Sequence, residues 1–434
     1  MATGRSARWD AMASDPAANG AAAPPRDRVL SQDLGQLVEQ LVDEGAVPEA
    51  QAPSLRRLAT LLRAHFHHEF LAVKLRLRYA WERLEGTDGR SNATTGDQRE
   101  LATDVLATLR KLLARANFTD VPIDELHEAM RRHSSFGLKI ELDLGDFADL
   151  AAWRRRETMR REERRSWFGL RRTTIAVQRY DRFCIFARFK GAERFADGKR
   201  LEGKLGARPG GVTLRLYRDV PKHDVEALFP GVKVGMRTFD RALLGVPAAA
   251  GALQVLNLKL LGSLYALLLA VMVLLGFRQG DAQLGARGLG ELAGVAVLVT
   301  FLFRQWARFL GRKNLLHRQL AEHLQTCTLD SGLGVLLHLL DDAEAEEAVE
   351  VLLAWVFLQR AGEPVTRASL DAQVEEWLAR QLGLEVDFEE DDALDKLERL
   401  GLARSTADGR ALALPVDAAL AVLERRWAAL YARS

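Results

Sequence analysis

Apolar residues recur every three or four positions over much of the chain, the spacing of an α-helix with one buried face. Before a glycine-containing boundary near residue 137, this pattern predicts helices at 30–41, 55–84, 98–116 and 123–132. It returns after residue 306 and predicts helices at 306–324, 335–358, 367–382 and 391–400. Acidic residues at 341–347 interrupt the second of these, which is either one helix or two.

The period shortens to two in the middle of the chain, as expected for half-buried strands. Phe183, Ile185, Ala187 and Phe189 alternate in this way. Strands are predicted at 138–144, 173–180, 182–189 and 212–217, with a short helix at 146–153. This region is therefore predicted to be a small α+β module with a mainly antiparallel sheet.

Two long apolar segments follow. Residues 260–277 are eighteen consecutive positions without a charge, enough at about 1.5 Å per residue to cross most of a roughly 30 Å hydrocarbon core. The second segment, 289–303, is weaker because Glu291 lies near its start, and whether it fully spans stays open. We predict a transmembrane helical hairpin at 258–306.

Basic residues set the predicted orientation of the hairpin. Seven flank it and two lie in its turn, so the positive-inside rule places both termini in the cytoplasm. The expected location is the bacterial inner membrane, with the mitochondrial inner membrane as the alternative.

Together, these patterns predict an α+β membrane protein. Its expected parts are a disordered tail at 1–28, a helical module at 29–135, an α+β module at 136–235, a membrane-approach segment at 236–257, the hairpin at 258–306, a helical connector at 307–362 and a winged-helix-like domain at 363–434. Asp408 and Gly409 give the last domain the turn signal of a β-hairpin wing.

Charge decides what the winged-helix-like domain binds. The whole chain has 61 basic and 59 acidic residues, so only local excess carries information. From Arg367 onward there are fourteen acidic and nine basic residues, and Glu389–Asp392 begin the second helix of this domain. Phosphates would be repelled there. We expect no nucleic acid and a protein partner at the C-terminal domain.

An arginine-rich stretch lies at 154–172, with nine arginines, three glutamates, Trp167 and Phe168. Arginine binds lipid phosphates, and Trp and Phe favour the membrane interface. A solvated strand pair closed by Arg–Glu contacts is an equally good explanation. The residues expected to contact a membrane surface are Arg154, Arg155, Arg156, Arg160, Arg161, Arg164, Arg165, Trp167, Phe168, Arg171 and Arg172.

Small residues repeat every four positions within both apolar segments: Gly262, Ala266 and Ala270 in the first, Gly290 and Gly294 in the second. Such stripes allow helices to pack closely in lipid. The stripes differ in depth, so we expect one to serve the span packing within the chain and the other to contact a second copy, making a homo-oligomer.

Catalytic and metal signals are weak. Among His65, His67, His68 and Glu69, only His65 has partners at the i+3 or i+4 spacing that shares a helix face. The two cysteines are 143 positions apart and fit neither a disulfide scaffold nor a zinc site. The glycine-rich stretch at 191–211 lacks a nucleotide-binding motif. We predict no metal, no cofactor and no catalytic residue.

Several short motifs occur in a distinctive order. They are Trp167–Leu170, Leu216–Pro221, Phe229–Gly231, Asp240–Arg241 and Gly245–Pro247, supported by His68–Phe70, Leu329–Asp330 and Leu340–Ala343. In this order they resemble the uncharacterised domain family typified by transmembrane protein 143, over roughly residues 30–427. The resemblance implies a membrane protein with a large soluble body and no agreed activity, and it supplies no catalytic residues.

The sequence thus favours a membrane-anchored, non-enzymatic adaptor or scaffold with its soluble parts facing the cytoplasm. The alternative is a membrane-bound enzyme acting on lipid or a lipid-linked substrate. For that alternative the suggestive groups are His133, His223 and Asp224, whose spacing has no catalytic signature.

Overall fold

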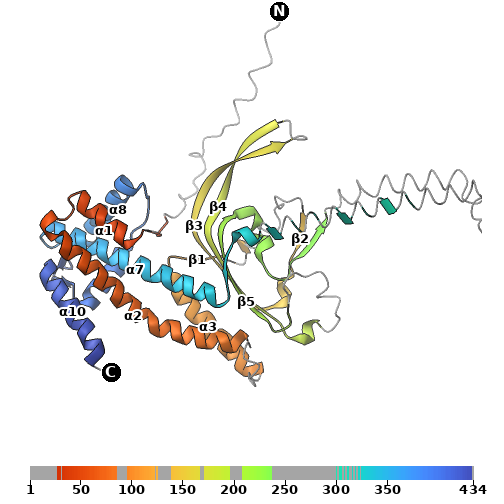
Figure 1. The fold of residues 1–434 in the computed structure, drawn as a ribbon, viewed down its shortest axis with the longest axis horizontal. Coiled ribbons are helices and arrows are strands. Elements are labelled where there is room, and N and C mark those ends of the chain that lie inside the picture. The colour runs from red at the N-terminus through yellow and green to blue at the C-terminus, as the bar shows by residue number, and fades with distance from the viewer. Residues whose placement is uncertain are drawn as a thin grey trace, which may run out of the picture. The chain divides into compact units, whose positions relative to one another are not determined.

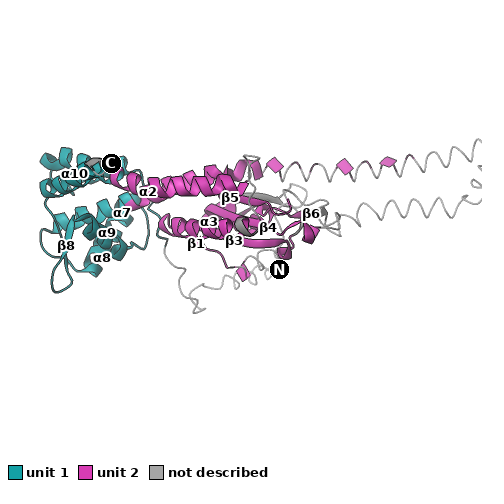
Figure 2. Cartoon of the chain, turned by 90° about the horizontal axis from the view of Figure 1, so that it is seen from below, with its two compact units in different colours: residues 1–63, 348–434 teal, residues 64–347 magenta. Residues whose placement is uncertain are grey.

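The chain is an α+β protein in the computed structural model (Figure 1). The structure describes residues 27–30, 32–85, 95–122, 124–125, 138–166, 171–195, 208–236 and 324–432, with scattered residues between 300 and 322. They belong to two compact units, coloured separately in Figure 2: unit 1 comprises 1–63 and 348–434, and unit 2 comprises 64–347. Two long helices, α2 (Ala52–Glu85) and α7 (Leu333–Ala361), contribute to both.

Unit 1 is mainly helical. Its other elements are α1 (Leu34–Asp43), η2 (Glu49–Gln51), α8 (Arg367–Leu382), α9 (Glu390–Leu400), β8 (Ala403–Ser405), β9 (Ala411–Ala413) and α10 (Val416–Ala432). The Asp33 side chain caps α1 by accepting from the backbone N–H groups of Gly35 and Gln36. Helices α8 and α9 end at Gly383 and Gly401, both left-handed, where a Cβ would be strained.

The predicted helices and hairpin of the C-terminal region are confirmed. Strands β8 and β9 pair antiparallel from Ala403 with Ala413 to Ser405 with Ala411. Gly409 supplies the positive φ that this turn needs, at +76°. The apolar stripe of α9, which includes Leu394 and Leu397, is buried, so the helical period correctly identified its inner face.

Unit 2 is built on a five-stranded antiparallel sheet of order β1-β3-β4-β5-β7. A separate pair, β2 with β6, is also antiparallel. The strands are β1 (Thr119–Asp120), β2 (Leu138–Glu141), β3 (Phe147–Ser166), β4 (Arg171–Phe189), β5 (Val212–Pro221), β6 (Lys233–Met236) and β7 (Thr328–Ser331). The described part of this unit also contains helix α3 (Thr95–Arg115) and the 3-10 turns η3 (Leu144–Asp146), η4 (Ala192–Phe195) and η5 (Lys222–Leu228).

Both faces of the sheet are covered at its centre, because every residue of β4 from Phe183 to Ala187 is at most 1% exposed. On one face Phe183, Ile185, Ala187 and Phe189 pack with Leu228 and Phe229, which confirms the predicted alternation. The other face carries Trp153, Cys184, Phe186, Leu214 and Leu216, all buried.

Strands β3 and β4 continue beyond their neighbours as a two-stranded ribbon. Strand β1 pairs with β3 only at Trp153 and Arg154, and β5 pairs with β4 only from Arg179 to Arg188. Beyond that, among the strands that the structure describes, β3 and β4 pair only with each other, out to Ser166 with Arg171. Figure 1 shows this ribbon extending past the other strands.

Three local predictions are wrong. Of the helix predicted at 146–153, residue 146 ends the 3-10 turn η3 and residues 147–153 belong to β3, whose backbone pairs with β4. The strands expected at 173–180 and 182–189 form one strand, which continues through Asp181. Helix α7 is uninterrupted across 341–347, since several of its carboxylates are buried and paired with arginines.

The predicted transmembrane hairpin at 258–306 is corrected as well. None of the helices in the described part of the chain combines the length and the apolar character needed to cross a bilayer. Long helices in this part carry charge along their length; α7 alone has six carboxylates between 341 and 350. Among the described residues the fold class is therefore α+β, and the predictions of a membrane hairpin and of an inner-membrane location, bacterial or mitochondrial, are withdrawn.

Residues 258–299 of that hairpin lie outside the described residues. So do the predicted tail up to residue 26, the approach segment from residue 237 and nearly all of the helix predicted at 123–132.

Candidate functional site: arginine and carboxylate clusters of unit 2

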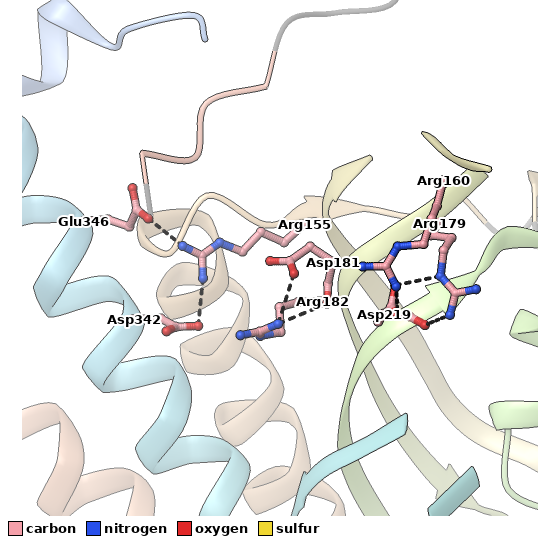
Figure 3. A network of polar contacts seen from close by, with 8 residues as sticks. All are labelled: Arg155, Arg160, Arg179, Asp181, Arg182, Asp219, Asp342 and Glu346. Carbon is pink, nitrogen blue, oxygen red and sulfur yellow. Dashed lines mark hydrogen bonds and ion pairs between the residues drawn. The ribbon is translucent and has the colours of Figure 1, made fainter. Parts of the chain in front are cut away.

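The most deeply buried charge of the sheet is Arg155 on β3. It lies two residues after Trp153 and so shares its face. Its side chain is 6% exposed, and its guanidinium donates to Asp342 Oδ2 at 2.8 Å and to Glu346 Oε1 at 2.5 Å (Figure 3). The two acids are four residues apart on α7, the spacing that places side chains on one helix face.

A second arginine meets the same helix. Arg115, in the last turn of α3, donates through Nε to Glu347 Oε1 at 2.5 Å and through Nη2 to Glu69 on α2 at 3.1 Å. Burial disfavours the charged guanidinium, but Glu347 and Glu69 outweigh that effect and raise the pKa of Arg115. The Arg115 guanidinium also lies 4.1 Å from the centre of the Phe70 ring.

These contacts form one electrostatic clasp, which we define as Glu69, Arg115, Arg155, Asp342, Glu346 and Glu347. It links α2, α3 and α7 to β3 within unit 2. Glu347 is 1% exposed and Glu346 is 3% exposed. Buried charges lose much of their hydration, so removing one partner leaves the others uncompensated at a cost of about 3–5 kcal/mol. The clasp therefore holds the helices on the sheet.

A third group fixes the base of the β3–β4 ribbon. Arg179 donates through Nε to Asp219 Oδ1 at 2.6 Å, and Arg160 donates through Nη1 to Asp219 Oδ2 at 3.0 Å (Figure 3). Asp219 has a left-handed backbone with φ of 50°, which aspartate tolerates better than most residues. Its carboxylate thus joins β3, β4 and β5 where β5 stops pairing.

Two carboxyl groups are buried in η5, against β4 and β5. Asp224 is 2% exposed and Glu226 is 4% exposed. Within the described residues, Glu226 Oε2 has no hydrogen-bond partner. Burial, with the nearby charge of Asp224, raises the pKa of Glu226 to about 7. His223 Nε2 is 3.6 Å from Asp224 Oδ2.

The residues predicted for a membrane surface are scattered among these contacts. Arg154 pairs with Glu125 at 2.8 Å, Arg155 belongs to the clasp and Arg160 pairs with Asp219. Arg156 is half-buried and Arg161 is exposed. Arg164, Arg165, Arg171 and Arg172 lie in the β3–β4 ribbon, but their side chains fall outside the description, as do Trp167, Phe168 and the span-packing residues Gly262, Ala266, Ala270, Gly290 and Gly294.

Other reactive side chains are held apart or shielded. His67 pairs with Glu344 at 2.9 Å, and across the described residues no three His, Cys, Asp or Glu side chains are grouped to bind a metal ion. Cys184 and Cys327 are buried. Burial raises the pKa of both thiols, most strongly for Cys184, which disfavours the thiolate form that a cysteine nucleophile needs. His133 lies outside the described residues.

Sequence reasoning missed a role for Asp219, Asp342, Glu346 and Glu226. The motifs that contain Asp219 and Asp342 were used only as signs of a family resemblance. A usable signal was present in α7, where carboxylates occupy positions on the helix face that also carries Leu339 and Ala343, both buried. Acids on an apolar helix face indicate a buried basic partner.

We predict that Arg155→Met lowers the free energy of unfolding by about 3–5 kcal/mol, because Asp342 and Glu346 would stay buried without a counter-charge. Urea denaturation followed by circular dichroism measures this. Arg160→Met is the matched control: its side chain is 65% exposed, so the loss should stay below about 1 kcal/mol. Equal effects of the two substitutions would contradict the clasp.

We predict that Glu226→Gln stabilises the protein at alkaline pH. A carboxyl whose pKa rises on folding from 4.5 to about 7 favours the folded state at low pH, and that contribution is lost as pH rises through 7. The variant should therefore match the wild type near pH 4, below the unfolded pKa, and exceed its stability by roughly 3 kcal/mol near pH 8.5.

Urea denaturation between these two pH values tests the Glu226 prediction. Glu193→Gln, which changes an exposed carboxyl of η4, should shift stability little at any pH. A Glu226→Gln difference that stays constant with pH would show that the carboxyl does not titrate in this range.

One comparison with known proteins gives a match. Residues 180–334 match the family model described as a protein of unknown function (DUF3754), about a third of the chain. The matched range contains β4 from Tyr180 onward and all of β5, η5, β6 and β7. It therefore includes Asp219, which pairs with Arg179, and the buried carboxyls Asp224 and Glu226. No solved structure matches the chain. Residues 180–334 are thus similar to a domain whose function is unknown.

Proposed function

We propose that this chain is a non-enzymatic adaptor whose C-terminal module binds a protein partner through the acidic outer face of α9. The observation that carries the proposal is the division of that helix into two faces. Ala393, Leu394, Leu397 and Leu400 are buried. The exposed positions are Asp391, Asp392, Asp395, Glu398 and Arg399, four acids and one base.

The acids are spaced for a common surface. Asp391, Asp395 and Glu398 are separated by four and three residues, so they follow one stripe along the helix. Asp391 and Asp392 have side chains that are 70% and 53% exposed. A basic protein surface is the partner that complements such a stripe, whereas nucleic-acid phosphates would be repelled.

Internal ion pairs involve two of the four acids. Asp391 pairs with Arg367, and Asp392 pairs with Lys396 at 2.5 Å. Lys396 is buried and also contacts Glu350 at 2.9 Å, so its charge serves the interior of unit 1. Asp395 and Glu398 remain the centre of the stripe.

A relationship to the family typified by transmembrane protein 143 is part of the same proposal. We infer it from residues 216–221, 229–231 and 245–247, all within the range that matches the domain of unknown function. That family has no agreed activity, which fits a binding role and assigns no catalytic residue.

Site-specific photocrosslinking in cells tests the adaptor proposal. A photoreactive residue at Asp395 should give a discrete adduct with one basic protein, and Asp391→Asn with Glu398→Gln should abolish it, because the stripe loses its charge. The same photoreactive residue at Glu376, which is exposed on α8, should not give that adduct.

A matched set of neutral substitutions controls for net charge. Glu363→Gln, Glu376→Gln and Glu385→Gln change three exposed carboxyls of the same module outside α9 and should leave the adduct intact. Identical adducts from positions 395 and 376, or none from 395, would contradict the proposal.

A further inference from the structure

Helix α2 carries two apolar faces in unit 2. The inner face includes Phe66, Phe70, Leu77 and Trp81, each at most 3% exposed. Leu71, Leu75 and Tyr79 are instead 39%, 59% and 64% exposed. A helix packed on one side normally presents polar residues on the other, so these three side chains need a separate explanation.

The three exposed side chains form a continuous stripe. They are four residues apart, and at 3.6 residues per turn they fall within about 80° of one another. The same geometry puts the centre of the stripe on the side of the helix opposite Leu77 and Trp81. Single exposed apolar residues are common, but a contiguous stripe indicates an interaction surface.

Basic residues border the stripe on both sides. Lys74 and Arg78 follow one edge, and Arg76 and Arg83 follow the other. The Arg83 guanidinium lies 5.7 Å from the centre of the Tyr79 ring. Asp104 and Glu82 balance Arg76 and Arg78 in part, through pairs of 2.8 Å each. The border as a whole stays cationic.

The basic border indicates which kind of partner can bind the apolar stripe. A second copy of α2, packed antiparallel about Leu75, would set Arg76 against Lys74 near the two-fold axis, and like charges there oppose association. A helix with an apolar stripe and acidic flanks would complement both the apolar centre and the basic edges.

We propose that Leu71, Leu75 and Tyr79 of α2 bind an amphipathic helix of another protein, one whose apolar stripe is bordered by Asp and Glu. This second docking surface is separate from the acidic face of α9 and does not depend on it. Three anchoring side chains make a small interface, so the contact is transient, with a Kd in the range of about 1–100 μM.

The test uses the full chain and a fluorescein-labelled helical peptide with leucine at successive i, i+4 positions and glutamate on both flanks. Fluorescence anisotropy should report binding that weakens as salt rises from about 0.05 to 0.5 M, because the flanking charges are exposed. A peptide with lysine in place of glutamate should bind at least about tenfold more weakly.

Substitutions then locate the binding surface. Leu75→Glu should weaken binding of the glutamate peptide at least about tenfold, and circular dichroism should stay unchanged because glutamate favours helices. Met159→Glu is the matched control, an equally drastic change at a residue of β3 that is 69% exposed, and should leave binding unchanged.

Several results would overturn the proposal. They are no binding of the glutamate peptide, equal binding of the lysine peptide, or equal binding by Leu75→Glu. A wild-type dimer in sedimentation that Leu75→Glu dissociates would assign the stripe to a second copy instead. Capture by anionic vesicles that Leu75→Glu abolishes, without peptide binding, would assign it to a lipid surface. None of these outcomes affects crosslinking at Asp395.

Discussion

The burial of Arg155 is the constraint on which the rest of unit 2 depends. A guanidinium that is 6% exposed needs carboxylates within hydrogen-bond distance, and both come from one face of α7 at Asp342 and Glu346. That requirement fixes the rotation of α7 about its axis. The same pairing explains why the acidic residues at 341–347 do not interrupt α7, because arginines neutralise the buried carboxylates of this stretch. Glu347 then meets Arg115, which brings α3 to the same place.

In the described part of unit 2, one face of the sheet packs against these helices and the other packs against η5. The surfaces left for binding are on the outside. They are opposite in character: α9 in unit 1 presents carboxylates, whereas α2 in unit 2 presents leucine and tyrosine between basic edges. An adaptor with two such surfaces would recognise two chemically different partners.

Much of the local structure could be predicted from residue spacing. Apolar residues repeating with the helical period of 3.6 correctly predicted α1, α2, α3, α8 and α9. Apolar residues alternating along β4, among them Phe183 and Ile185, correctly predicted its inner face. The helix predicted at 146–153 was wrong. Leu150 to Trp153 suit a helix by composition, and it is their pairing with β4 that makes them part of a strand. A long uncharged run likewise predicted a membrane hairpin, which the described helices do not support.

The acids of α7 gave a local signal for a buried basic partner, but the identity of that partner could not be predicted, because a charge pair between residues nearly two hundred positions apart has no local pattern. Arg155 was one arginine among nine in its stretch. Its neighbours Arg154 and Arg156 gave no sign that, of these three, only Arg155 would be buried. Asp219 and Glu226 depend in the same way on the sheet that surrounds them.

A double-mutant cycle between Arg155 and Glu346 tests the central claim most directly, using Arg155→Met, Glu346→Gln and both changes together. If the two groups stabilise each other in the interior, each single substitution will lower the free energy of unfolding. The double variant will then lose less stability than the two single losses added together, with a coupling energy of roughly 2–3 kcal/mol. Additive losses, with a coupling within about 0.5 kcal/mol of zero, would contradict the account.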